Sequence, residues 1–166
     1  TQLDLLERFV SERGGSLLML GGMESFAAGG YRKSPLARVL PVSLDDVAAT
    51  PAPQRWKLSL TRDGWLQPWA RLRSTEEEEQ ARLKSWPAYH TLNSVGREKP
   101  GATVIAEVAA RSGAKQPAVV AHRYGEGRCA AVLLGDLWRT QLEQADSQRA
   151  KDDLGKAWRQ MVRWLI

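Results

Sequence analysis

Residues 16–31 read SLLMLGGMESFAAGGY, an apolar run that leads into a turn rich in glycine. The run Leu17–Leu20 has no polar alternation, which is typical of a strand buried on both faces, as in a parallel sheet. Many α/β enzymes mount a reactive Ser or Cys in the turn after such a strand, with the spacing Gly-x-Ser/Cys-x-Gly. Here the turn has no cysteine, and Ser25 stands between Glu24 and Phe26. The stretch therefore predicts the scaffold of an α/β enzyme without a nucleophile in its turn.

The chain around this stretch contains signals for further helices and strands. Gly14 is suited to end a helix that precedes the stretch, because glycine adopts the left-handed conformation of a C-cap. Ser34 and Pro35 mark another helix start, with Ser34 as the N-cap. The acidic run Glu76–Glu79 is predicted to form the first turn of a helix, where carboxylates favour the helix dipole. Together these signals predict helices at 2–13, 34–39, 74–86 and 147–166, a strand at 56–61 closed by a turn at 62–64, and irregular chain at 43–55 and 87–101.

The second half of the chain has a different pattern. Short apolar stretches, separated by turn residues, occupy residues 102–110, 118–124 and 128–134. Connections this short join strands that run in opposite directions, so they predict antiparallel hairpins. With the strand at 17–20, the pattern predicts one α/β domain over residues 1–166, with a mainly parallel sheet and an antiparallel hairpin region.

Composition excludes several classes of function. The net charge is +5, but Lys and Arg are scattered and no zinc-finger or RNA-binding motif is present, so the pattern does not favour a nucleic-acid partner. Cys129 is the sole cysteine, which excludes an internal disulfide and a multi-cysteine zinc site. With only His90 and His122 as histidines, we expect no metal site and no cofactor. We also expect no signal peptide and no contact with a membrane from this segment, since no apolar run approaches ~20 residues. The compartment cannot be read from the sequence.

The glycine-rich turn is the first candidate for a site. Backbone N–H groups at glycines can approach an anion at a helix N-terminus, although neither a Walker lysine nor a full dinucleotide fingerprint follows. Asp136 and Trp138 come after the last apolar stretch and could neighbour this turn, because ligands of open parallel sheets bind beyond the carboxyl ends of strands. The alternative is a structural turn, with Asp136 as a loop hydrogen-bonding residue and Trp138 as a packing anchor. The candidate ligand-binding residues are Gly21, Gly22, Met23, Glu24, Ser25, Asp136 and Trp138.

The remaining candidates favour structural roles. Cys129 lies inside an apolar stretch, where a free cysteine usually acts as a small buried side chain. His122 lies in the neighbouring stretch and could pair with Cys129, but no third orienting group can be identified. His90 lies in a loop without a recognisable partner. The basic face of the last helix is interpreted as a solvated surface.

Six segments of the chain, taken in order, carry a family resemblance. They are Phe-Val-x-x-Arg-Gly-Gly-Ser-Leu-Leu-Met-Leu-Gly-Gly at 9–22, Ser-Phe-Ala-Ala-Gly-Gly-Tyr at 25–31, Ser-Pro-Leu-Ala-Arg-Val-Leu-Pro-Val at 34–42, Lys-Pro-Gly-Ala-Thr-Val at 99–104, Tyr-Gly-Glu-Gly-Arg at 124–128 and Trp-Arg-Gln-Met-Val-Arg-Trp-Leu at 158–165. In these segments the chain resembles the glutamine amidotransferase-like family of bacteria, a branch of the class I glutamine amidotransferase-like superfamily.

The resemblance implies a flavodoxin-like three-layer sandwich whose first βα units lie upstream of residue 1. It also implies a segment of a larger bacterial cell-envelope protein, with a protein partner or neighbouring domains of the same polypeptide. True amidotransferases carry a cysteine at the strand-to-helix elbow, and later a His-x-Glu pair. This chain has Gly21-Gly22-Met23 at the elbow and no histidine after His122, so the resemblance carries no catalytic residue.

The leading hypothesis is accordingly a non-catalytic interaction or ligand-binding module. The alternative is a hydrolase or amidotransferase-type enzyme with an unorthodox site. That site would be built around Glu24, Ser25, Asp136 and His122, or would use groups outside this chain.

Overall fold

The computed structural model describes residues 1–47, 49, 54–143 and 147–166. Its strands form one mixed sheet of order β1-β5-β4-β3-β2. These strands are β1 (Ser16–Leu20), β2 (Lys57–Leu60), β3 (Thr103–Ala109), β4 (Lys115–Tyr124) and β5 (Gly127–Val132). The helices are α1 (Gln2–Arg13), α2 (Leu36–Val39), α3 (Arg62–Leu66), α4 (Glu76–Ser85), α5 (Trp138–Glu143) and α6 (Gln148–Leu165), with a 3-10 turn, η1, at Tyr31–Lys33. None of the helices so described has the length and apolar composition that crossing a bilayer requires.

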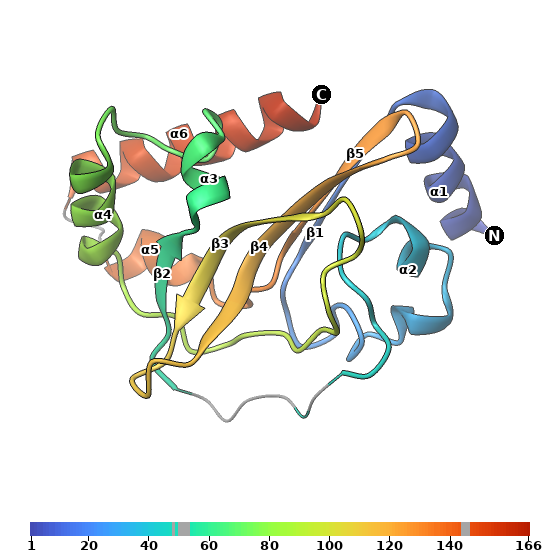
Figure 1. Ribbon diagram of the computed structural model, residues 1–166, viewed down its shortest axis with the longest axis horizontal. Helices are drawn as coiled ribbons and strands as arrows, with labels where there is room; N and C mark the ends of the chain where they lie inside the picture. The colour runs from blue at the N-terminus through green and yellow to red at the C-terminus, as the bar shows by residue number, and fades with distance from the viewer. Residues whose placement is uncertain (48, 50–53, 144–146) are drawn as a thin grey trace.

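Helices cover both faces of the sheet (Figure 1). Side chains alternate between the two faces along each strand, so cross-strand partners share a face. Val119 of β4 is the partner of Val132 of β5, and both contribute to an apolar space that α6 closes. His122 is the partner of Cys129 and faces the opposite layer, where its Nε2–H donates to the carbonyl of Val39 at the end of α2.

Most of the expected elements are confirmed. α1 ends at Gly14, which has a left-handed φ of 68°. The hairpins β3–β4 and β4–β5 are antiparallel, as the short turns predicted. In α4, the side chain of Thr75 accepts from the amide of Glu78, and the acidic run forms the first turn. The apolar face of α6 is turned to the sheet, and its basic residues Arg149, Lys151, Lys156, Arg159 and Arg163 are exposed.

The prediction of a mainly parallel sheet is wrong. β1 pairs with β5 in parallel, but the other pairs, β2–β3, β3–β4 and β4–β5, are antiparallel. β1 is also an edge strand whose residues are half-buried, with Leu20 exposed, so it is not buried on both faces as expected. A continuous apolar run fits an edge position here because α1 and α6 both pack against β1. The flavodoxin-like three-layer sandwich, with its first βα units upstream of residue 1, stays a prediction.

The expected turn at 62–64 is the start of helix α3. The hydroxyl of Thr61 caps this helix by accepting from the amide of Gly64 at 2.9 Å. A Cβ on Gly64 would lie 1.8 Å from the carbonyl oxygen of Ile105 on β3. The glycine therefore permits a close approach of two backbones, and the Arg-Asp-Gly sequence, which resembles a turn, gave the wrong prediction.

The start of α2 also differs from the prediction. The N-cap of α2 is Pro35, and no side chain caps the helix. The hydroxyl of Ser34 instead donates to the carbonyl of Tyr31, the first residue of η1. Part of the expected irregular chain at 43–55, namely residues 48 and 50–53, lies outside the described residues.

Candidate functional site

The glycine-rich bend after β1 lies against the segment that follows β5. Because the two strands are parallel, their carboxyl ends reach the same edge of the sheet. The amide of Gly21 donates to the carbonyl of Val132 at 2.7 Å. A Cβ on Gly21 would lie 2.5 Å from the carbonyl oxygen of Leu134, so the backbones touch there. The expectation that the segment containing Asp136 neighbours the bend is confirmed.

Asn93 holds the bend in place. Its Oδ1 accepts from the amide of Gly22 at 2.9 Å, and its Nδ2 donates to the carbonyl of the same residue at 2.8 Å. The amide side chain therefore satisfies both backbone groups of Gly22, as a neighbouring strand would. Sequence reasoning missed this residue, because an asparagine in expected irregular chain, 71 positions from its partner, carries no local signal.

Asp136 is buried and its oxygens are occupied. They accept from the backbone amides of His90 at 2.8 Å and Thr91 at 3.2 Å, and Oδ2 lies 2.8 Å from Nε of Arg139. These contacts support the interpretation of Asp136 as a loop hydrogen-bonding residue. The ring of His90 lies nearby, with Nδ1 3.7 Å from Oδ2 of Asp136, but this nitrogen has no hydrogen-bond partner among the residues that the structure describes. The sequence indicated no such pair, because its members belong to loops 46 residues apart.

The other candidate residues of the bend differ in exposure. Met23 is 90% exposed, Glu24 is exposed, and Ser25 is half-buried. The residue after Ser25, the buried Phe26, has a positive φ of 57°. Positive φ at a bulky residue is uncommon and costs about 1–3 kcal/mol. The strained position therefore presents a core phenyl ring and not a reactive group.

Trp138 is not a packing anchor. It is 55% exposed at the start of α5, and the guanidinium of Arg139 lies 5.0 Å from its ring centroid. Leu142, one turn further along the helix, is 64% exposed. Exposed apolar side chains therefore stand on α5, directly after the segment that lies against the bend.

Cys129 and His122 are neighbours, but they lie away from the bend. Cys129 is fully buried, and this burial raises the pKa of its thiol to about 12. Burial also lowers the pKa of His122, whose Nε2–H donates to Val39. Cys129 lies three residues before Val132, the residue whose carbonyl accepts from Gly21 at the start of the bend. Three residues span about 10 Å along a strand. The expected set of Glu24, Ser25, Asp136 and His122 is therefore not gathered in one place.

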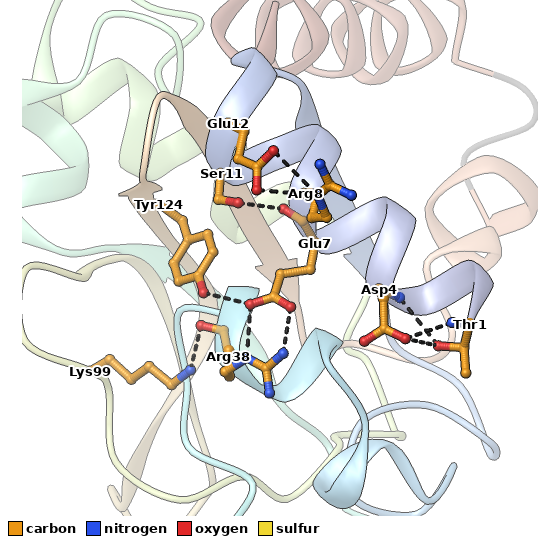
Figure 2. Close-up of polar contacts among 9 residues, drawn as sticks. All are labelled: Thr1, Asp4, Glu7, Arg8, Ser11, Glu12, Arg38, Lys99 and Tyr124. Atoms are coloured by element: carbon orange, nitrogen blue, oxygen red, sulfur yellow. Dashed lines mark hydrogen bonds and ion pairs between the residues drawn. The ribbon is translucent and has the colours of Figure 1, made fainter.

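A polar network joins α1, the end of α2 and Tyr124 of β4 (Figure 2). Glu7 of α1 accepts from Nε of Arg38 at 2.7 Å and from the hydroxyl of Tyr124 at 3.1 Å. The hydrogen bonds from Arg38 hold the pKa of Glu7 below its usual value. Lys99 donates to the carbonyls of Ala37 and Arg38, and burial lowers its pKa. These contacts join α1 to α2 and cap the end of α2, which is a structural role.

A cavity of about 340 Å³ opens near the bend. Its wall is formed by Asp46, Ala49, Asn93, Ser94, Val95, Gly96, Arg97, Glu98, Gln116, Pro117 and Leu133. It shares Asn93 with the bend but takes none of its wall from Gly21–Ser25. Within the described ranges, no three His, Cys, Asp or Glu residues are grouped so that they could hold a metal ion.

Comparison with known proteins supplies a family and two structural relatives. A family model described as "Putative glutamine amidotransferase" matches residues 1–166. The fold is similar to that of cytoplasmic protein STM3548 from Salmonella typhimurium, with 22% identity and a TM-score of 0.67 over 98% of this chain and 59% of that one. It is also similar to cytoplasmic protein STM1381 from Salmonella typhimurium LT2, with 21% identity and a TM-score of 0.62 over 99% of this chain and 60% of that one. The chain thus spans about three-fifths of either structure. No curated protein matches the sequence.

Proposed function

Because the chain belongs to the family described as "Putative glutamine amidotransferase", we propose that it is a non-catalytic member of that family. In this proposal it serves as an interaction or ligand-binding module of a larger bacterial protein. The observation that carries the proposal is the position of the sole thiol, which is buried in the middle of β5 and absent from the bend after β1.

The thiol of Cys129 is unsuited to nucleophilic catalysis. Thiolate, not thiol, attacks an amide carbon, and catalytic cysteines have lowered pKa values in partly exposed sites. Because burial raises the pKa of Cys129 to about 12, its thiol stays protonated at neutral pH. Its cross-strand neighbour His122 donates its Nε2–H to a backbone carbonyl, and burial lowers its pKa, so it favours the neutral imidazole.

The surface beside the bend supports a contact role. Met23 directly follows Gly22, and Trp138 lies three residues after Gly135, the residue that approaches Gly22. Met, Trp and Arg are enriched at protein interfaces, and Arg139 lies against the Trp138 ring. Asn93 fixes the bend rigidly, which lowers the entropic cost of binding. The partner in this proposal is a protein or a neighbouring domain of the same polypeptide.

Ammonia release from glutamine tests the absence of catalysis. We expect the protein and the Cys129→Ala variant to release ammonia at the rate of a protein-free blank. Ammonia release by the unchanged protein that disappears in Cys129→Ala would refute the proposal.

Site-specific photo-crosslinking tests the contact role. A photoreactive residue at Met23, 90% exposed, is compared in cells with one at Leu66, 63% exposed on α3. We expect a discrete crosslinked product from position 23 and none from position 66. Equal products from both positions, or none from either, would count against a contact surface at the bend.

A hydrolase is the second candidate, and the His90–Asp136 pair favours it. An imidazole beside a buried carboxylate is two-thirds of a nucleophile-His-Asp arrangement, and Ser25 is the hydroxyl of the adjoining bend. A fluorophosphonate probe tests this directly, since it labels activated serines. Labelling that is lost in both Ser25→Ala and His90→Ala would establish the hydrolase and displace the leading proposal.

A further inference from the structure

The apolar space between α6 and the sheet is a cavity of about 110 Å³. Both α4 and α6 lie on this side of the sheet (Figure 1), and both contribute to the wall. The wall takes no residue from Gly21–Ser25, so the cavity is separate from the bend. Protein interiors contain few voids larger than a water molecule, because unfilled space forfeits contacts. A cavity of this size is therefore a specific feature of the molecule, with room for an occupant.

Small side chains at two places in the wall leave this space. One row of wall residues crosses four strands, each residue being the cross-strand partner of the next: Leu60, Ala106, Val119 and Val132. Cross-strand partners share a face of the sheet. Ala106 is the smallest member of this row, and Ala157 is a small residue of the α6 wall. Larger side chains at these two positions would fill the cavity from the sheet or from the helix.

The wall selects against charged and polar ligands. Its residues are all aliphatic or aromatic, and none is charged. The hydroxyl of Tyr89, which belongs to one of them, is 2.6 Å from the hydroxyl of Thr140, so it already has a hydrogen-bond partner. A charge or an unpaired polar group that moved into this space would lose its hydration without compensation. Water in an apolar cavity also has few partners, so an apolar ligand displaces it at little cost.

Aromatic rings on several sides of the cavity favour a planar ligand. The wall includes the indoles of Trp69, Trp86 and Trp158. Trp69 is stacked on Trp164, with ring centroids 4.6 Å apart, so its plane is fixed. Aromatic rings attract one another in offset and edge-to-face arrangements, which adds to the area they bury. An apolar cavity of about 150 Å³ accepts benzene, and the present cavity is smaller but partly open to solvent, so it suits a single ring.

From these observations we infer that the cavity between α6 and the sheet binds a small, uncharged aromatic molecule. The ring of this ligand occupies the space that Ala106 and Ala157 leave, and the indole side chains of the wall surround it. The inference goes beyond the proposed function, because it concerns a different part of the molecule and requires no property of the bend.

Titration with benzene, followed by the methyl signals of the protein in NMR, tests the inference. We expect saturable shifts of the methyl signals of Val119, Val132 and Met161, and nuclear Overhauser effects between them and the benzene protons. Benzoate, which carries the same ring with a charge, is the control ligand. The net charge of +5 attracts benzoate to the protein, so its failure to shift these signals would reflect the apolar wall.

Two alanines of α6 give a matched pair of variants. Both are half-buried, but Ala157 lines the cavity and Ala150 does not. We expect Ala157→Leu to weaken benzene binding roughly tenfold or more, because the larger side chain fills the space, and Ala150→Leu to leave it unchanged. Circular dichroism establishes that each variant is folded. If Ala157→Leu fails to fold, Ala106→Val fills the cavity from the sheet and should weaken binding in the same way.

Several results would overturn the inference. They are the absence of saturable shifts with benzene, Overhauser effects confined to methyl groups outside the wall, equal shifts with benzoate, and an equal response of the two α6 variants. Ammonia release and crosslinking at position 23 test the proposed function without involving this cavity, so the two proposals can fail separately.

Discussion

Removal of the Glu79 carboxylate is expected to destabilise the protein severely. Glu79 is 1% exposed in the first turn of α4. Its Oε2 accepts from the backbone amides of Leu72 at 3.1 Å and Arg73 at 3.0 Å, and its Oε1 pairs with the guanidinium of Arg82. The carboxylate thus connects α4 to the chain before it and neutralises a buried arginine.

The expected magnitude follows from these contacts. Breaking a buried ion pair by removing one partner costs about 3–5 kcal/mol, because the other charge stays buried. The orphaned backbone amides would each add about 1–3 kcal/mol, reduced by water that enters the space. We therefore expect Glu79→Ala to lower the free energy of unfolding by about 5 kcal/mol, the low end of these contributions together. This is a large share of the ~5–15 kcal/mol that stabilises a typical domain.

Urea unfolding followed by tryptophan fluorescence and circular dichroism measures this loss. Glu77→Ala is the matched control, since Glu77 lies in the same acidic run but is exposed, and it should change stability by less than about 0.5 kcal/mol. Replacing both members of the pair, in Glu79→Leu with Arg82→Leu, should recover part of the loss because no charge is left buried. A loss below about 1 kcal/mol in Glu79→Ala, or one equal to that of the control, would refute the reasoning.

Three further outcomes are expected. Gly21→Ala should destabilise the protein by about 2–4 kcal/mol in urea unfolding, because its Cβ would lie 2.5 Å from the carbonyl oxygen of Leu134; unchanged stability would show that the bend is not held against that segment. The thiol of Cys129, fully buried and with a pKa of about 12, should react with a chromogenic disulfide reagent at neutral pH only after denaturant is added; rapid reaction in the native state would contradict its burial. Burial lowers the pKa of His122 below the usual histidine value of about 6.5, so the unfolded state binds this proton more readily. Stability should therefore fall as the pH decreases below about 6.5. His122→Asn should flatten this part of the stability–pH curve, and a curve of unchanged slope would exclude His122 as its source.

Local signals in the sequence predicted the helices and hairpins well. Gly14 ends α1, the acidic run forms the first turn of α4 and short turns join β3, β4 and β5, because these features depend on contacts within a few residues. Local reasoning failed where a neighbour in space changed the outcome. Gly64 resembled a turn residue, but it lies in a helix that passes close to Ile105.

For the candidate site too, some features could be predicted from the sequence and others could not. That the bend lies beside the segment containing Asp136 could be predicted, since parallel strands end at one edge of a sheet. Its hydrogen bonds could not, because Asn93 and Gly22 are 71 residues apart and the pair His90–Asp136 is 46 apart. Neither hydrophobic periodicity nor motif spacing in the sequence indicates which loops come into contact.

The sequence by itself determined that no thiol stands in the glycine-rich bend and that one cysteine lies within an apolar stretch, because composition and order alone establish both. Only the tertiary structure decided the order of the strands in the sheet, the exposure of Trp138 and the burial of one carboxylate among four glutamates. These properties depend on which distant segments pack together. The free energy of that packing depends on both residues of each contact, so it cannot be predicted from one residue without its neighbour.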